Sequence, residues 1–428
     1  PLIKHNLPDI QMSQSEETNK FKLFNDPIYG FIAIPSELIF DLIEHPFFQR
    51  LRRIGQLGLS SLVYPGAYHT RFHHALGAMH LTQKAISVLQ NKGHNISKSE
   101  SESVQVAILL HDIGHGPFSH ALEHTLIDDI THESLSLMLM QRLNNEMKGK
   151  LTEAIQIFTN KHPKRFLYQL VSSQLDMDRL DYLKRDAFYT GVVEGSINSE
   201  RLISMLNIAN GELVLDNKGV SSVQKFLVSR SLMYWQVYMH KAVLCAENML
   251  VKLLSRAHEI AQIDETMFGG KELLFFLVNR PSKKEFESNP NILNLFTQLD
   301  DSDILAAMKQ WRNHKDFILS DLSSRLLDRK LFQIKFLPEK INSDKLNYLE
   351  KSISDSMGIT LIDSRYFILE GTASNSTYVS NKEEIKILNR EGNVIPLSAA
   401  SEILPLSVYS HTLTRPFVCW PKEIKWTD

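Results

Sequence analysis

Residues 104–120 read VQVAILLHDIGHGPFSH. The apolar part, residues 104–110, is too short and too interrupted to cross a membrane, and it predicts a buried helix. His111 and Asp112 follow this run directly, and His115 comes four positions after His111. Ionisable groups at the end of a buried helix must be paired or ligated, because burying them alone is costly. The sequence therefore predicts a polar cluster where this helix ends.

Histidine is concentrated around this cluster. Ten of the 17 histidines lie between His69 and His132. Imidazole nitrogens beside carboxylate oxygens suit a divalent first-row transition metal. A single His-Asp pair is also compatible with a polar helix end that has a His cap and a surface Asp, because the dipeptide is common. The concentration of histidines, more than the pair itself, favours metal binding or acid–base chemistry.

The composition excludes several protein classes. The 428 residues are 43% hydrophobic and 22% charged, as in a soluble globular protein with a sizeable core. Lys and Arg number 47 against 49 for Asp and Glu, which gives no support for a nucleic-acid coat or a membrane-surface protein. Two cysteines, Cys245 and Cys419, make no disulfide framework and favour a reducing cytoplasm. The N-terminus lacks a signal-peptide core, and no run reaches membrane-spanning length.

The patterning predicts a mainly α-helical protein with a small α+β C-terminal part. Residues 1–20 are expected to be a flexible N-terminus, 21–328 a helical core and 329–428 the α+β region. Residues 21–34 have the turn residues of a hairpin. The expected helices include a basic one at 47–57, one at 75–89, one at 166–189, and either one long helix or two nearly collinear helices at 221–262, where proline and glycine are absent.

Three of these helices could supply a metal site. His111 and Asp112 come from one helix end, a second helix offers His73 or His74, and a third offers Asp176, Asp178 or Asp181. Two imidazoles and two carboxylates leave coordination positions open for water and substrate, as in catalytic sites. Nearby cations are suited to phosphate capture: Arg50, Arg52, Arg53, Arg71, Arg179 and Lys184.

Each of these features also has a purely structural interpretation. A lone His73 or His74 is often a satisfied polar residue of the core. The aspartates at 176–181 could be the solvated face of a helix, and Asp181 with Arg185 could be an ordinary i,i+4 ion pair. The coincidence of all of them on neighbouring segments favours the metal site.

The ordered set His74, His111-Asp112 and Asp178 resembles the H…HD…D signature of the HD-domain phosphohydrolases. Longer strings resemble the deoxynucleoside triphosphate (dNTP) triphosphohydrolase branch of that family, and the resemblance covers about residues 21–260. These strings are NDPIYG at 25–30, FQRLRRIGQLG at 48–58, YPGAYHTRFHH at 64–74, HDIGHGPFSH at 111–120 and DMDRLDY at 176–182.

The resemblance implies roles for particular residues. The implied metal ligands are His74, His111, Asp112 and Asp178, and the implied catalytic residues are His115, His120, Glu123 and His132. The implied contacts to phosphates, sugar and base are Gln56, Leu57, Arg71, Arg179, Tyr182, Asp186, Arg230, Tyr234 and Tyr238. Glu123, Arg179 and Tyr234 replace the Asp, Lys and His of the animal enzymes. Residues at the family's regulatory nucleotide site are Lys22, Asn25, Glu44, Gln49 and Arg52, with Glu44 in place of Asp.

The implied reaction is metal-dependent hydrolysis of a dNTP to deoxynucleoside and inorganic triphosphate, by attack of a metal-activated water on the α-phosphate. The divalent ion is Mg, Mn, Fe, Co, Ni or Zn, because two imidazoles and two carboxylates accept each of them. The expected partners are the nucleotide and further copies of the chain, in a dimer or tetramer, without membrane or nucleic acid. Two alternatives remain open: a phosphohydrolase for another nucleotide, such as a nucleoside monophosphate, or a catalytically silent nucleotide sensor.

Overall fold

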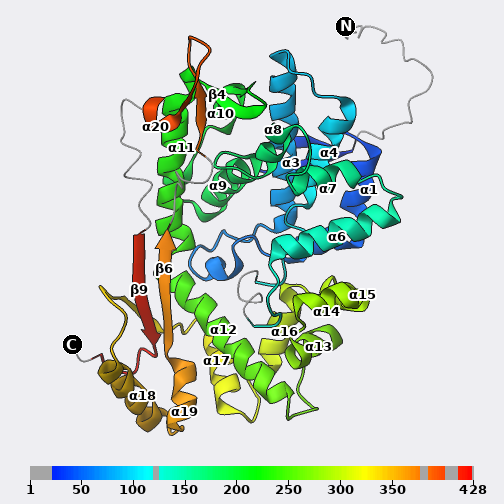
Figure 1. Ribbon diagram of the computed structural model, residues 1–428. Helices are drawn as coiled ribbons and strands as arrows, with labels where there is room; N and C mark the ends of the chain where they lie inside the picture. The colour runs from blue at the N-terminus through cyan, green and yellow to red at the C-terminus, as the bar shows by residue number, and fades with distance from the viewer. Residues whose placement is uncertain (1–21, 119–124, 376–383, 401–412, 427–428) are drawn as a thin grey trace, which may run out of the picture.

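The computed structural model describes residues 22–118, 125–375, 384–400 and 413–426. The flexible segment expected at 1–20 lies outside these described residues. Within them the chain is mainly α-helical with small β-sheets, which confirms the predicted fold class (Figure 1). None of the helices in the described ranges is both long and apolar enough to cross a membrane.

The first half of the chain is built around helix α3, which packs against α4 and α9 (Figure 1). The expected hairpin is present as β1 (Leu23–Asp26) paired with β2 (Gly30–Ala33). The helices of this half are α1 (Glu37–Glu44), α2 (Pro46–Gln49), α3 (Arg71–Asn91), α4 (Lys98–Leu110), α6 (His132–Glu146), α7 (Thr152–Phe158), α8 (Arg165–Val171), α9 (Met177–Thr190) and α10 (Ser199–Ser204), with the 3₁₀ turns η1 (Arg50–Arg53), η2 (Gly58–Leu62) and η3 (Val193–Gly195).

Side-chain caps fix where the key helices begin. Ser97 and Glu100 form a reciprocal capping box at the start of α4, and its last eight residues, 103–110, are all buried, as the apolar run predicted. The side chain of Asp176 accepts a hydrogen bond from the backbone N–H of Arg179 and begins α9. This cap separates α9 from α8, so the single helix expected at 166–189 is two helices.

The basic helix expected at 47–57 is also shorter than predicted. Helix α2 continues as the 3₁₀ turn η1 and stops at Ile54. Beyond that point Gly55 forms a β-bridge with Thr70 and donates its backbone N–H to Asp301. These long-range hydrogen bonds hold the chain extended where its composition alone favoured a helix.

The second half of the chain contains the segment at 221–262, which was expected to form either one long helix or two nearly collinear helices. It forms two helices, α11 (Val220–Met233) and α12 (Lys241–Ala261), joined by a π-helical turn at Tyr234–Tyr238. His240 caps α12 by accepting from the backbone N–H of Ala242. Helix α12 packs against α17 in the lower half of Figure 1. The helices that follow are α13 (Lys271–Asn279), α14 (Lys283–Ser288), α15 (Pro290–Phe296), α16 (Asp301–Trp311) and α17 (Phe317–Leu327).

The C-terminal region is α+β, as expected. One sheet has the strand order β5-β9-β6, with β6 and β9 side by side in Figure 1. A second sheet, β3-β4-β7-β8, joins strands from both sides of the predicted boundary near residue 328, because β4 pairs in parallel with β7. The elements are β3 (Leu206–Ala209), β4 (Glu212–Asp216), η4 (Asn217–Gly219), β5 (Gln333–Phe336), α18 (Ser343–Met357), α19 (Leu361–Ser364), η6 (Arg365–Phe367), β6 (Leu369–Asn375), β7 (Lys386–Leu388), β8 (Val394–Pro396), α20 (Leu397–Ala400) and β9 (Leu413–Trp420).

Candidate active site

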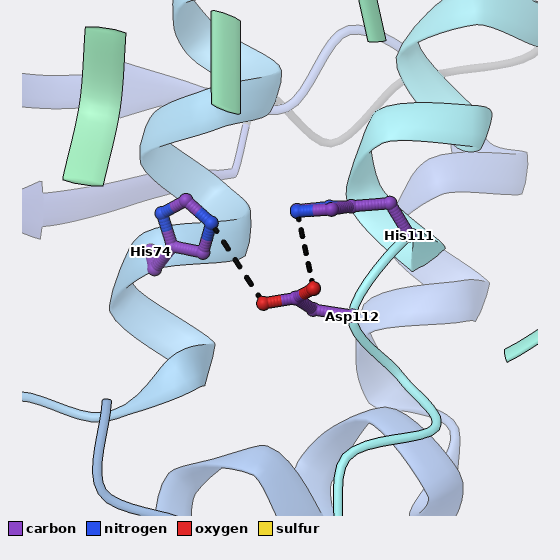
Figure 2. A group of neighbouring side chains, drawn as sticks. All are labelled: His74, His111 and Asp112. Carbon is purple, nitrogen blue, oxygen red and sulfur yellow. Dashed lines mark ion pairs between the residues drawn. The ribbon is translucent and has the colours of Figure 1, made fainter. Parts of the chain in front are cut away.

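Three helices bring the four expected metal ligands together. Figure 2 shows His74 on α3 facing His111 and Asp112 at the end of α4. His111 Nε2 lies 3.3 Å from Asp112 Oδ1, and His74 Nε2 lies 4.0 Å from Asp112 Oδ2. Asp178, in the first turn of α9, places Oδ1 3.1 Å from His74 Nε2 and 3.5 Å from His111 Nε2. Two imidazoles and two carboxylates therefore converge on one point.

The chemistry of this cluster fits a divalent ion. The Nε2 atoms of His74 and His111 are buried, yet neither makes a hydrogen bond to any described group. Buried polar atoms normally have partners, so two unsatisfied nitrogens beside two carboxylates are a signature of a ligand set. His74, His111 and Asp112 also have donor atoms close enough together to hold one ion.

The protein alone already balances the charges of this cluster. Burial by itself would lower the pKa of His74, but the adjacent carboxylates of Asp178 and Asp181 outweigh it and raise that pKa to about 10. At His111, burial would also lower the pKa, but the charges of Asp112 and Asp178 outweigh burial. The pKa of His111 is therefore raised. The neighbouring histidines hold the pKa values of Asp112 and Asp178 below their usual range, against the effect of burial. A metal ion would displace protons from these imidazoles.

The geometry separates the alternatives that the sequence left open. His73 lies on α3 next to His74, but its Nδ1 accepts from the backbone N–H of Thr70 at 3.2 Å and completes the cap of that helix. Asp176 caps α9, and Asp181 contacts the Nδ1 atom of His74 at 2.8 Å, on the far side of the ring from the cluster. Among the candidates on α3 and α9, His74 and Asp178 are the residues that face His111.

His115 and His132 form a stacked pair beside the cluster. Their ring centroids are 3.9 Å apart with planes inclined by 17°. Burial, together with the charge of Arg71, lowers the pKa of His115 to about 3, so this ring is neutral at physiological pH. Asp112, His115 and His132 have donor atoms close enough for a second ion. Two further imidazoles therefore lie beside the ligand cluster.

The loop between His111 and His115 is held tightly against α6. A Cβ atom on Gly114 would lie 2.3 Å from the backbone nitrogen of Ser136 and 2.4 Å from the carbonyl oxygen of His132. The backbone N–H of Gly114 also donates to Ser136 Oγ. Glycine is therefore required at this position by the close approach of the two backbones.

A cleft of about 520 Å³ opens beside the cluster, within the usual range for small-molecule sites. Most of the substrate contacts implied by the resemblance lie on its wall. The expected residues that line it are Gln56, Leu57, Arg71, Asp112, His115, His132, Asp178, Arg179, Tyr182, Asp186, Tyr234 and Tyr238.

Comparisons with known proteins identify the family of the chain. Residues 71–186 match the HD domain family, and residues 197–268 match the HD associated region. The chain is 32% identical over 417 residues to the uncharacterized protein YwfO of Bacillus subtilis, covering 94% of this chain and 93% of YwfO. The crystal structure of a phosphohydrolase from Bacteroides thetaiotaomicron is similar with a TM-score of 0.91 and 49% identity, covering 94% of this chain and all of that one. The chain belongs to the HD-domain phosphohydrolases.

A further relative has a substrate in its name. The HD phosphohydrolase is 26% identical over 395 residues to the deoxynucleoside triphosphate triphosphohydrolase SAMHD1 homolog of Dictyostelium discoideum. The match covers 85% of this chain and 74% of that protein.

Three of the expected catalytic and substrate-contact residues of the HD phosphohydrolase are not among the described residues that line the cleft. Arg230 is buried under Tyr234, 5.7 Å from its ring centroid and 3.4 Å from Gln174 Oε1, and is not on the described cleft wall. His120 and Glu123 lie outside the described residues, so their catalytic roles stay predictions.

The basic residues expected around the metal are not all available for phosphate. Arg50 is buried and donates to the carbonyl oxygens of Leu299, Ile113 and His115, which makes it a structural residue. Arg53 is half exposed and pairs with Asp300. Sequence spacing could not distinguish these two arginines, because their partners lie 63 to 249 residues away along the chain.

The five residues of the expected regulatory site all lie in the N-terminal part of the chain, and two of them are in contact. Arg52 stacks 3.6 Å from the ring of Phe72 and donates to Gln49. Lys22 and Asn25 are exposed on the hairpin, and Glu44 is exposed at the end of α1. Their role in binding a nucleotide stays a prediction.

Sequence reasoning missed other residues that line the cleft: Gly58, Ser60, Phe118, Val243 and Glu247. It also missed His69, whose Nε2 lies 2.7 Å from Asp186 Oδ1 and whose ring stacks on Tyr189. His69 lies within the quoted YPGAYHTRFHH string, which was a usable signal. The sequence contains no comparable signal for Glu247, because this residue lies inside an amphipathic helix, where surface glutamates are common.

Proposed function

We propose that this HD phosphohydrolase hydrolyses dNTPs to deoxynucleosides and inorganic triphosphate. Water attacks the α-phosphorus, the bond from phosphorus to the 5′-oxygen breaks, and the 5′-oxygen takes up a proton. The oxygen of the water stays on the triphosphate. The main support is that one cleft is lined both by Asp112, Asp178 and His115 of the cluster and by a second group, Tyr182, Asp186 and Tyr238.

The phosphate end combines a metal site with cations and neutral donors. A divalent ion held by His74, His111, Asp112 and Asp178 would polarise a phosphate oxygen and lower the pKa of a water molecule. His115 is neutral, so its ring can hydrogen-bond a phosphate oxygen without adding a buried charge.

Arginines on two helices flank the phosphate end. Arg71 Nη1 lies 2.5 Å from Asp112 Oδ2, beside the cluster. Arg179 lines the cleft from α9, with its Nε donating to the carbonyl oxygen of Ser173. This anchoring leaves the terminal nitrogens of Arg179 for a triphosphate, to which arginine is suited.

The other end of the cleft is suited to a deoxyribose. Asp186 is fixed by two hydrogen bonds, one from Tyr238 Oη at 2.7 Å and one with His69 Nε2 at 2.7 Å. Tyr182 packs at 6.1 Å from the ring of Tyr238 and presents an aromatic wall. We propose that Asp186 accepts a hydrogen bond from the 3′-hydroxyl and that Tyr182 excludes a 2′-hydroxyl.

Product analysis tests this proposal directly. The full chain is incubated with each of the four dNTPs, with ribonucleoside triphosphates and with nucleoside monophosphates, in Mg²⁺, Mn²⁺ or Co²⁺, and the products are separated by chromatography. Deoxynucleoside and inorganic triphosphate are expected from dNTPs. Release of orthophosphate or pyrophosphate alone, or turnover of monophosphates only, would reject the proposed reaction. Tight dNTP binding without turnover in any metal would indicate a sensor.

Matched variants identify the site. Asp178→Ala is expected to abolish turnover, whereas Asp355→Ala, exposed on α18, is expected to retain it.

We also propose that the protein self-associates as a dimer or tetramer. Sedimentation that finds only fully active monomer would contradict that part.

A further inference from the structure

Buried ionic contacts continue behind the metal cluster. On the side of the His74 ring opposite the cluster, Nδ1 lies 2.8 Å from Asp181 Oδ2. Asp181 accepts two hydrogen bonds from Arg185, at 2.9 and 3.0 Å. Arg185 donates a third hydrogen bond, at 2.8 Å, to Asp26 Oδ2. All four residues are less than a tenth exposed, so they form one buried chain from the hairpin turn to the ligand cluster.

This chain differs from an ordinary helix ion pair. An exposed i,i+4 pair contributes only about 0.3–0.5 kcal/mol. Asp181 and Arg185 are fully buried, and each has a further partner on another element, His74 on α3 and Asp26 on β1. Such a pair is maintained only when its geometry satisfies the charges on both sides.

Helix α3 is shaped to admit this pair. A Cβ atom on Gly77 would lie 2.0 Å from Asp181 Oδ1 and 2.2 Å from Arg185 Nη2. Glycine inside a helix costs about 1 kcal/mol relative to alanine, so it is used where space demands it. The absence of a side chain at Gly77 therefore lets α9 present the carboxylate and guanidinium directly beneath His74.

The far end of the chain of contacts is fixed by the hairpin turn. Asp26 Oδ1 accepts the backbone N–H groups of Ile28 and Tyr29, at 2.9 and 3.0 Å. Its other oxygen receives Arg185. One carboxylate thus shapes the β1–β2 turn and anchors the guanidinium, which explains the Asp in the NDPIYG string in physical terms.

We propose that Asp181 and Arg185 are positioning residues that orient His74 as a metal ligand, with Asp26 as their anchor on the hairpin. By accepting from Nδ1–H, Asp181 fixes the tautomer that leaves the Nε2 lone pair pointing at Asp112 and Asp178. Carboxylates behind a ligating histidine act in this way on ring orientation and basicity. The inference rests on the metal site of the proposed function.

Metal binding by the full chain tests the proposed positioning role without a measurement of activity. Metal-free protein is titrated with Co²⁺, and the absorption bands of the bound ion are recorded. Asp181→Asn is expected to weaken Co²⁺ binding by about 10- to 100-fold and to shift those bands. Asp316→Asn is the matched control, because Asp316 makes a two-point pair with Arg256 between α17 and α12. It is expected to leave both readouts unchanged.

A more distant variant separates positioning from folding. Asp26→Asn does not touch His74 and is expected to weaken Co²⁺ binding in the same direction, with an unchanged circular dichroism spectrum. If Asp181→Asn does not fold, the Co²⁺ affinity of Asp26→Asn alone tests the positioning role. Affinity within twofold of wild type in a folded variant would overturn the inference. Failure of the wild type itself to bind Co²⁺ would instead reject the metal site on which the proposed function depends.

Discussion

Replacement of Arg50 by methionine should destabilise the fold by about 3 kcal/mol. The guanidinium donates to three buried carbonyl oxygens at 2.8–3.0 Å. Hydrogen bonds from a charged donor contribute roughly 2 kcal/mol each. Burial opposes this contribution, because it lowers the pKa of Arg50 from 12.5 to about 10, and each unit is worth about 1.4 kcal/mol. The balance of these two effects gives the expected loss.

Arg53 provides a matched control on the same 3₁₀ turn. Its side chain is 53% exposed and pairs with Asp300, so Arg53→Met should cost about 1 kcal/mol or less. The measurement is urea unfolding followed by circular dichroism, with comparison of midpoints at equal slope. A loss below about 1 kcal/mol for Arg50→Met, or equal losses for both variants, would refute the role given to the three carbonyl contacts.

Three further predictions concern the site and its surroundings. His111→Ala and Asp112→Ala should each lose bound metal and activity while keeping the wild-type circular dichroism spectrum; a collapsed spectrum would indicate a structural role instead. Treatment with EDTA should abolish hydrolysis and Mn²⁺ should restore it, and full activity in metal-free protein would contradict the metal site. Burial raises the pKa of Asp301 from 3.8 to about 6, so its contribution to stability is complete below pH 3.8 and is lost as pH rises through 6, by at most about 3 kcal/mol. The stability of wild type relative to Asp301→Asn, from urea unfolding, should thus be greater at pH 4 than at pH 7.5, and a pH-independent difference would contradict this.

The residues of the ligand cluster could be predicted because their signal is local. The apolar run before His111 predicts the buried end of α4, and the aspartate string predicts the start of α9. The choice of His74 over His73 could not be made from the residues alone, since both follow Thr70 within one helical turn. It is decided by the helix cap, which engages the ring of His73.

Long-range contacts account for what the sequence did not predict. No proline or glycine marks the break between α11 and α12, yet the π-helical turn there carries Tyr238, whose hydroxyl donates to Asp186 on α9. The ion pair of Asp181 and Arg185 has the spacing of an exposed helix pair, and only its burial under Gly77 distinguishes it. Periodicity predicts which face of a helix is apolar, but not which distant segment will cover it.

The parallel pairing of β4 with β7 has a consequence for how the chain would come apart. Leu215 and Asp216 align with Ile387 and Leu388, and 171 residues intervene between the members of each pair. A single protease cut after Asp328 would therefore leave two fragments that stay joined along that strand and co-elute in native chromatography. Once the smaller fragment has been removed, the larger fragment would expose the edge of β4. An exposed strand edge can pair with other chains and lead to aggregation.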